Sequence, residues 1–586
     1  MKKFLLGLLC GFLLAGLGCI ILFFALVRLG ESRPSIPSEG ALVLRLEGDL
    51  PELAPMELPL PVFQAQTPPS LAEVWSMLRK AEKDPRVKAI FLEPRGVGVG
   101  WARLQEIRAS LLNFRRSGKP VYAFLRNPGT REYYLATAAD RIFFTQEDIL
   151  DLKGLRAEMH FYRRTLDKIG VEFEVEHAGK YKDAADGYVR TGPSPETREV
   201  MNSVLDTVFQ NLLDVVGTSR KMKEEQVRAL IDQGPFLAKQ ALAKGLVDGL
   251  AFEDEAYDKL AAQVKIPKLA RIGMRDYRQA PVAGFGEGKT KVALLIGEGT
   301  ITRGGESDPF GDDEGIRSGS FIQTLRQVAE DSSISGVILR VNSPGGDAIA
   351  SDEILHEVRK LAKAKPMVIS MSDMAASGGY YISMTGDPVI AYPLTYTGSI
   401  GVIFGKPNAR QLYSKLGIDI EVMKRGQNAD FDLLSQPMSA AARTRLKEGI
   451  DNTYRAFLDR VSEGRKRKTS EIEPLAEGRV WMGSQAKANG LVDELGGLDK
   501  ALDLVKKKAN VPDGERVQIL LYPKRKSLFE QLFNSMPEAS SEARARREVR
   551  ARIREWASTL GIDPGRLALW SQGGVFRLAP FELRIR

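Results

Sequence analysis

Two glycine-rich turns in the sequence carry the residue types that acyl-transfer chemistry needs. One is residues 342–347 (NSPGGD) and the other is residues 375–381 (AASGGYY), and each follows closely on an apolar run typical of a buried strand. Adjacent glycines let the backbone approach a bound substrate and direct several N–H groups at one point. The two turns therefore predict a site at the ends of neighbouring strands.

Ser377, in the second turn, is the candidate nucleophile. It stands at the start of an expected helix and is followed by two glycines. We expect its oxyanion to be met by the N–H of Gly378 and by an N–H of the first turn, for which we assign Gly346. The alternative is structural, with Ser377 capping a helix between two tight turns.

The scarcity of cysteine and histidine narrows the chemistry. The two cysteines, Cys10 and Cys19, both lie in the first 20 residues, so thiol nucleophiles and zinc–thiolate sites are excluded from the rest of the chain. The three histidines, His160, His177 and His356, argue against a histidine-rich metal site. A serine nucleophile here would need a base other than histidine, and we expect neither a metal nor a cofactor.

The chain repeats itself after about 250 residues. Residues 168–175 (KIGVEFEV) match residues 415–422 (KLGIDIEV) at an offset of 247, and residues 244–248 match 489–493 at an offset of 245. Such a period is too long for a solenoid unit. It indicates a tandem duplication of a whole domain.

Each copy has the pattern of an α/β domain with mainly parallel strands. In the second copy, apolar runs typical of strands alternate with segments of helical periodicity. The runs are residues 292–296, 336–341, 366–371 and 388–392, and the helical segments are 351–364 and 438–465. We place the first domain at 34–284 and the second at 285–520, with the boundary in the turn-rich stretch Pro281–Thr290.

The N-terminal end of the chain is predicted to cross the membrane. Phe4–Val27 carries no charged side chain, and as a helix it would be about 36 Å long, enough to cross a bilayer. We assign residues 1–33 as a single-pass anchor, with a cleaved signal peptide as the alternative. Residues 521–586 are assigned as a basic tail. Within it, residues 542–555 are predicted to form a basic helix, which either contacts anionic lipids, or is a solvated helix face or a tail docked on the domain. The net charge of +9 is too mild to argue for nucleic acid.

The motifs NSPGG, MAASGGYY and TGSIGV together resemble the signal peptide peptidase SppA (protease IV) family. These are membrane-bound serine peptidases of the Clp-protease/crotonase superfamily. The resemblance extends over nearly the whole chain. It implies tandem Clp-protease/crotonase-like α/β domains after one N-terminal transmembrane helix, with a Ser–Lys dyad divided between the two halves.

The resemblance also assigns roles to particular residues. It makes Ser377 the nucleophile, Lys182 in the segment GKYKD the general base, and Ser399 the hydroxyl that orients the lysine. Lys180 and His177 lie close by and remain alternatives for the base. A lysine has an ordinary pKa of about 10.4, so burial would have to lower it before the amine could accept a proton.

The repeat supports a divided site independently of the resemblance. The offset of 247 sets Ser377 on Thr130 and Lys182 on Ala429. Each half therefore keeps one member of the dyad and lacks the other. This pattern fits a composite site between the halves.

The sequence is thus expected to encode a membrane-anchored serine endopeptidase that degrades cleaved signal peptides and other short or unfolded apolar peptides. The resemblance implies a homotetramer in the bacterial inner membrane, with the N-terminus inside and the catalytic domains on the periplasmic side. The net charge leaves nucleic acid out of the expected partners. The alternatives are a crotonase-like acyl-CoA enzyme and a catalytically inactive membrane scaffold.

Overall fold

The computed structural model describes residues 36–53, 68–282, 288–304, 315–524 and 575–579, together with Gly11, Gly18, Gly286 and Ile585. The predicted anchor and most of the basic tail therefore lie outside the described residues. Within the described part of the chain, no helix is long and apolar enough to span a bilayer.

The first half is built on a six-stranded parallel sheet, ordered β8-β4-β3-β2-β1-β9. Its strands are β1 (Gly40–Gly48), β2 (Val87–Val97), β3 (Val121–Leu125), β4 (Arg141–Phe144), β8 (Gly249–Leu250) and β9 (Ala270–Gly273). The larger helices around it are α2 (Leu71–Lys83), α3 (Trp101–Arg116), α7 (Pro195–Arg220) and α10 (Glu253–Gln263). Smaller elements are α4 (Thr130–Ala136), β5 (Ile149–Leu150), α5 (Arg163–Ile169), α6 (Asp186–Val189), α8 (Glu224–Ile231), β7 (Phe236–Leu237), α9 (Ala238–Ala243) and α11 (Met274–Gln279).

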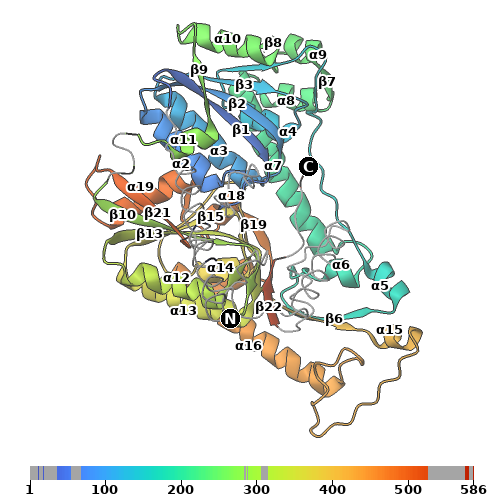
Figure 1. Ribbon diagram of the computed structural model, residues 1–586. Coiled ribbons are helices and arrows are strands. Elements are labelled where there is room, and N and C mark those ends of the chain that lie inside the picture. The colour runs from blue at the N-terminus through green and yellow to red at the C-terminus, as the bar shows by residue number, and fades with distance from the viewer. Residues whose placement is uncertain are drawn as a thin grey trace.

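The second half has a matching sheet, ordered β19-β17-β15-β13-β10-β21, with β16 and β20 attached at its side. Its strands are β10 (Thr290–Glu298), β13 (Ile334–Ser343), β15 (Met367–Ala376), β16 (Val389–Ala391), β17 (Tyr396–Gly398), β19 (Val480–Met482), β20 (Glu494–Leu495) and β21 (Val517–Tyr522). Its helices are α12 (Ser318–Glu330), α13 (Ala348–Ala364), α14 (Gly378–Ile382), α15 (Arg410–Lys415), α16 (Ala440–Arg465), α17 (Thr469–Ile472), α18 (Gly483–Ala488) and α19 (Leu498–Lys508). Figure 1 shows the sheet of the first half above that of the second, with α5, α6 and β6 of the first half at the lower right, beside the second half.

The predicted strands and helices of the second copy are confirmed. The four apolar runs form β10, β13, β15 and β16, and the two helical segments form α13 and α16. The central strands β10, β13 and β15 pair in parallel and are buried along nearly their whole length, which explains their continuous apolar sequence. Helix α13 begins at an Asp347 cap, whose carboxylate accepts the N–H of Ala350.

Equivalent contacts in the two halves confirm the duplication. The hydroxyl of Tyr133 donates to the carbonyl of Leu246 at 2.7 Å. At the matching place in the second half, the hydroxyl of Tyr380 donates to the carbonyl of Leu491 at 2.8 Å. The helices α7 and α16 also match, since both have 26 residues and end in a left-handed lysine.

A third sheet joins the halves, in the order β12-β11-β14-β22-β18-β6. Its other strands are β11 (Ile301–Thr302), β12 (Ile316–Arg317), β14 (Gly345–Asp347), β18 (Val402–Asn408) and β22 (Val575–Leu578), while β6 (Glu172–Ala178) comes from the first half. Strand β6 pairs antiparallel with β18 along its whole length, from Glu172 opposite Asn408 to Ala178 opposite Val402. The two halves therefore share a sheet as well as a packed surface.

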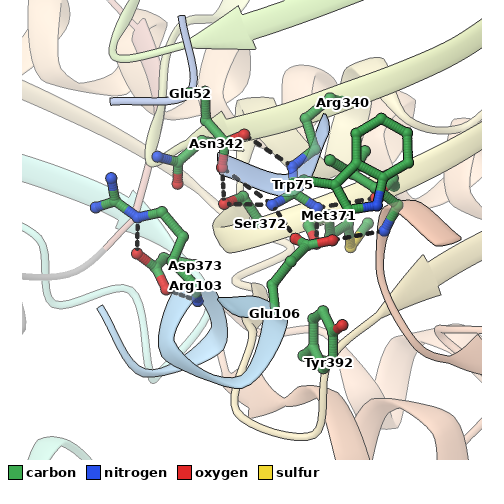
Figure 2. Close-up of polar contacts among 12 residues, drawn as sticks. Glu52, Trp75, Arg103, Glu106, Arg340, Asn342, Met371, Ser372, Asp373 and Tyr392 are labelled. Carbon is green, nitrogen blue, oxygen red and sulfur yellow. Dashed lines mark hydrogen bonds and ion pairs between the residues drawn. The ribbon is translucent and has the colours of Figure 1, made fainter. Parts of the chain in front are cut away.

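A buried ionic network also holds the halves together (Figure 2). Arg340 on β13 is 1% exposed and donates to both carboxylate oxygens of Glu52 at 3.1 Å and to Glu106 at 2.5 Å. It also donates to the hydroxyls of Ser370 and Ser372. Both carboxylates come from the first half, so a charge in the second half's central sheet is neutralised only when the halves are docked.

Removing the arginine should destabilise the folded chain strongly. The Arg340→Ala change leaves Glu52 and Glu106 buried without their cation, which costs about 3–5 kcal/mol. Urea unfolding followed by circular dichroism should show a clearly lower midpoint. Arg326→Ala is the matched control, because its ion pair with Glu357 is mostly exposed on the arginine side and should cost at most about 1 kcal/mol. Equal effects of the two changes would contradict this assignment.

Candidate functional site

Ser377 sits at a strained turn between strand β15 and helix α14. Its backbone has φ 53° and ψ −113°, which is unusual for a residue with a side chain. Its N–H donates to the carbonyl of Gly398 at 2.8 Å, and its side chain makes no capping hydrogen bond to the helix. The strand–turn–helix geometry therefore presents the hydroxyl to another group instead of to its own helix.

That other group is Lys182 of the first half. Its Nζ lies 2.7 Å from the Oγ of Ser377, 2.9 Å from the Oγ of Ser399 and 3.0 Å from the carbonyl of Ser399. All three residues are at most 1% exposed. Three of the five sequence-predicted site residues thus meet at one buried point, and each of these hydrogen-bond partners of the amine is a neutral oxygen.

Close backbone contacts explain how the lysine reaches the second half. Strand β6 ends at Ala178, beside β18, and the chain then turns so that Lys182 follows within four residues. A Cβ atom at Gly478 would lie 2.6 Å from the backbone nitrogen of Lys182, and one at Gly401 would lie 3.0 Å from the carbonyl of Ala178. Only glycine leaves room for this approach. Sequence analysis missed Gly478. What could have pointed to it is its position in the segment against which the Lys182 turn packs.

Ser399 is also held in an unusual conformation, with φ 50°. Its N–H donates to the carbonyl of Arg479 at 2.7 Å. This bond fixes the backbone so that both oxygens of Ser399 accept from the Lys182 amine. Ser399 can therefore orient the lysine, as the resemblance implies.

The two alternative bases point elsewhere. Lys180 is exposed and forms an ion pair with Glu477 at 3.3 Å. His177 is exposed too, with its Nδ1 3.0 Å from the carbonyl of Gly179. These residues lie at the end of β6 and in the following turn, so Lys180 does not share a strand face with Lys182. The geometry favours Lys182 over both.

A buried carboxyl group neighbours the lysine in sequence. Burial raises the pKa of Asp183 to about 6, while a hydrogen bond from the hydroxyl of Thr197 acts in the opposite direction. Thr197 lies in the first turn of α7, which begins after the Ser194 cap. Asp183 therefore ties the lysine-bearing turn to the longest helix of the first half.

The two glycine-rich turns meet next to Ser377. The glycine of the first turn that lies closest to Gly378 is Gly345, whereas the sequence assignment was Gly346. A Cβ atom at Gly345 would lie 2.5 Å from the nitrogen of Gly378, so these two glycines are in direct contact. Gly346 lies one residue further on, between Ile301 and Arg577 in the third sheet. The structure thus brings Gly378 and the 345–346 turn together, with Gly345 as the nearer member.

The equivalent place in the first half is filled by a side chain. There Glu132 stands where the second half has Gly379, by the repeat offset. Its carboxylate is 6% exposed and accepts the N–H groups of Val97 at 2.6 Å and Gly129 at 3.0 Å. A carboxylate therefore fills the place of a glycine in the first half, which also has Thr130 in place of Ser377.

Asp373, which sequence analysis missed, fixes the strand that leads to Ser377. Its carboxylate accepts the N–H of Gly100 at 2.9 Å and the N–H of Arg103 at 2.8 Å, at the start of helix α3 (Figure 2). The side chain of Arg103 donates to the same carboxylate. Asp373 thus caps a first-half helix while lying four residues before Ser377.

A second line of contacts joins the two glycine-rich turns to a buried carboxyl group. Asn342 donates to Glu298 at 3.1 Å and accepts the N–H of Met374 at 3.2 Å. Burial raises the pKa of Glu298 to about 7, the charge of Glu52 adds to this, and Arg103 opposes it.

In the described part of the chain, no three His, Cys, Asp or Glu side chains gather as a metal site would require.

Comparisons with known proteins show which family and which proteins this chain resembles. The sequence model of Peptidase family S49 matches twice, at residues 113–267 and 359–512. "Serine protease SPPA, chloroplastic" of Arabidopsis thaliana is 32% identical, over 77% of this chain and 67% of that protein. "Protease 4" of Haemophilus influenzae is 31% identical, over 86% of this chain and 85% of that protein. "Protease 4" of Salmonella typhi is 32% identical, over 80% and 76%. Among solved structures, a ClpP1 mutant from Listeria monocytogenes is 13% identical, covering 36% of this chain and 94% of that one, with a TM-score of 0.23.

The raised pKa of Glu298 should make stability depend on pH. Between its ordinary value of 4.5 and about 7, the folded chain holds this proton while the unfolded chain has released it. The free energy of unfolding should therefore fall as pH rises through this window and stay level above it. Melting temperatures measured from pH 4.5 to 8 should show this fall in wild type and a shallower one in Glu298→Gln.

Glu357→Gln is the control for this measurement. A hydrogen bond from Arg326 lowers the pKa of Glu357 to about 2, so its contribution to stability is lost only below pH 4.5. That variant should keep the wild-type slope between pH 4.5 and 7. An unchanged slope in Glu298→Gln would show that another group holds the proton.

Proposed function

Because the chain belongs to peptidase family S49, we propose that it is a serine endopeptidase in which Ser377 is the nucleophile and Lys182 the general base. The observation that carries the proposal is the 2.7 Å distance between Nζ of Lys182 and Oγ of Ser377, which come from different halves. The two S49 matches and the relatives called Protease 4 support serine peptidase chemistry. No observation favours the acyl-CoA alternative.

The proposed reaction is acyl transfer in two steps. The neutral amine of Lys182 takes the proton of the Ser377 hydroxyl as its oxygen bonds to the scissile carbonyl carbon. The lysine then returns the proton to the leaving amine, and the C–N bond breaks. Water, deprotonated by the same lysine, hydrolyses the ester and frees Ser377. The N–H of Gly378 and one from the 345–346 turn would stabilise the oxyanion.

Burial supports the role of a lysine as base. Removing an amine from water disfavours its charged ammonium form, although the attraction between Lys182 and the neighbouring Asp183 carboxyl acts in the opposite direction. The three oxygens that lie within hydrogen-bond distance of Nζ are uncharged. Ser399 supplies two of them, which hold the lone pair in line with the Ser377 hydroxyl. In this proposal Ser399 positions the base and does not itself react.

For substrate and location we propose short or unfolded apolar peptides, including cleaved signal peptides, at the bacterial inner membrane. The support is the motif resemblance together with the uncharged stretch Phe4–Val27. A single N-terminal anchor with the catalytic halves on the periplasmic side would bring the site close to peptides left in the bilayer.

Loss of either dyad member should abolish cleavage. Ser377→Ala and Lys182→Met should each lower kcat/KM by at least about 10³-fold, since nucleophile and base act as a unit. A quenched peptide with a Leu/Ala-rich core provides the assay. Lys180→Met is the matched control, because this lysine lies two residues away and is exposed. Full activity in Lys182→Met would exclude it as the base.

We also propose that copies of the chain assemble into a closed ring, for which the resemblance implies four copies. The support is an apolar segment, residues 416–423, that extends from the body between α15 and α16 (Figure 1). Five of its side chains are more than a third exposed: Leu416, Ile418, Ile420, Val422 and Met423. An exposed apolar cluster of this kind typically marks an interaction surface.

The repeat indicates what would cover this segment. The offset of 247 sets β6 on residues 419–425 and β18 on residues 155–161. Within the chain β6 pairs with β18, but the described structure assigns residues 419–425 to no strand. The same pairing between residues 419–425 of one copy and 155–161 of the next would be head-to-tail, and such contacts close into rings.

A charge in the apolar segment should break the ring. Ile420→Asp should lower the mass measured by light scattering toward that of one chain, because a carboxylate would be buried at the contact. Phe252→Asp is the control, since Phe252 is 61% exposed but lies on the first half at the start of α10. A wild-type chain that is already monomeric would refute the proposal.

A further inference from the structure

A short segment of the second half, just before strand β19, lies against the turn that carries Lys182. The carbonyl of Glu477 accepts the N–H of Tyr181 at 2.8 Å, and the carbonyl of Arg479 accepts the N–H of Ser399 at 2.7 Å. Tyr181 directly precedes the lysine, and both oxygens of Ser399 contact its amine. The backbone of this segment therefore touches the residues on both sides of the amine.

The side chain of Arg479 makes a second connection to the same turn. Its Nη1 donates to the hydroxyl of Tyr181 at 3.1 Å and forms an ion pair with Glu199. The Tyr181 hydroxyl in turn donates to the other carboxylate oxygen of Glu199 at 3.1 Å. Glu199 lies on helix α7. One arginine of the second half thus closes a ring of three polar contacts with two residues of the first half.

The guanidinium group of Arg479 also contacts two aromatic rings. Its central carbon lies 5.0 Å from the centre of the Tyr181 ring and 4.5 Å from that of Trp481, both within the range of cation–π attraction. Trp481 is fixed in turn, because its indole N–H donates to the carbonyl of Leu475 at 2.9 Å. The Arg479 side chain is 17% exposed, so these contacts are largely shielded from water. The arginine is therefore held in one position.

These contacts bear on the base because the Lys182 amine must stay close to the hydroxyl of Ser377. The backbone hydrogen bond from Tyr181 to Glu477 attaches the lysine-bearing turn to the second half at one point. The turn could still rotate about a single attachment. The side chain of Arg479 holds the same turn at a second point, through the Tyr181 hydroxyl, and so removes that freedom.

We propose that Arg479 is a positioning residue for the base: its side chain ties the turn that carries Lys182 to the segment that fixes Ser399, and so holds the amine in line with the nucleophile. Tyr181 and Glu199 are the first-half groups through which it acts. A base and a nucleophile on different halves need such a tie, because a misplacement of about 1 Å can slow a reaction about 10²-fold. This inference rests on the proposed function and adds the residues that aim the base.

Loss of the arginine side chain should slow the reaction without weakening substrate binding. Arg479→Met keeps an unbranched apolar side chain but removes the ion pair with Glu199 and the hydrogen bond to Tyr181. Its kcat should fall about 30-fold at nearly constant KM, because the lost contacts position the base and not the peptide. Since one nitrogen of the arginine makes both contacts, the single ammonium of Arg479→Lys should replace it and keep kcat within about threefold of wild type.

The pH dependence separates a positioning role from a role in overall stability. A lysine acts as a base only when neutral, so kcat/KM should rise with pH through the pKa of Lys182. A loosened turn lets water reach the amine, which favours the ammonium form and raises this pKa. The acid limb of the profile should therefore move to higher pH, by about one unit in Arg479→Met. A smaller folded fraction alone would lower the rate equally at every pH.

A neutral substitution separates position from charge. The charged and titratable groups around the turn are His177, Lys180, Asp183 and Glu199 of the first half and Glu477 and Arg479 of the second. Arg479→Met removes a positive charge from this set, and that alone would raise the pKa of Lys182. Tyr181→Phe alters no charge at neutral pH but removes the hydroxyl that Arg479 and Glu199 share. A shift of its acid limb in the same direction therefore reports the position of the turn.

Two further variants test the route of this effect. The double variant Arg479→Met/Tyr181→Phe should lose little more activity than Arg479→Met alone, because both changes break one set of contacts. Arg443→Met is the matched control. Arg443 also pairs with first-half carboxylates, Glu174 at 3.0 Å and Glu176, but these lie within strand β6 and not in the turn after it. This control should keep its acid limb at the wild-type pH.

The outcomes separate this inference from the proposed function. If wild type cleaves the quenched peptide, an acid limb that stays in place in Arg479→Met or in Tyr181→Phe overturns the inference. If wild type cleaves nothing, the proposed function fails. Competitive acetylation of Lys182 with acetic anhydride, followed by mass spectrometry, then gives its pKa without any need for cleavage. A higher pKa in both variants supports the inference, and an unchanged pKa overturns it. If Arg479→Met does not fold, Tyr181→Phe decides by the same two measurements.

Discussion

The antiparallel pairing of β6 with β18 is the contact on which the rest of the site depends. It carries a strand of the first half into a sheet of the second, and it ends where Lys182 must turn toward Ser377. The backbone hydrogen bonds of this pairing fix the distance that the Lys182 side chain must span. The close contact at Gly478 and the buried cation of Arg340 then hold the halves in the register that this pairing sets.

The duplication explains why the site is single although the fold is double. Both halves keep the sheet, the long helix and the tyrosine contact to the following turn. They differ at the site, because the first half has Thr130 and Glu132 where the second has Ser377 and Gly379, and the second half has Ala429 where the first has Lys182. Strand β6 of the first half leads to Lys182, which lies beside Ser377 of the second half. With this lysine and this serine together, a second lysine in the second half and a second serine in the first are not needed.

Much of the second half was predictable from sequence because its local signals agree with its tertiary environment. Buried parallel strands are continuously apolar, and α13 shows helical spacing and a capping aspartate. Other features depend on contacts between distant segments and leave no local pattern. The capping of helix α3 by Asp373 and the nearness of Gly345 to Gly378 belong to this class. The pairing of β22 with β14 is also of this kind, since four residues far along the chain carry no signal for their partner.

A lysine base and a peptide substrate place opposite demands on the same space. The amine must be kept from water to be neutral near physiological pH, whereas the serine beside it must be reached by a chain from solution. A site that is open at rest would satisfy the second demand at the expense of the first. Ser377 and Lys182 are at most 1% exposed, so the arrangement of the described residues meets the first demand. With Lys182 as the proposed base, a peptide would reach Ser377 only where a neighbouring segment gives way. The backbone pairing that buries the lysine would then also limit which chains can enter.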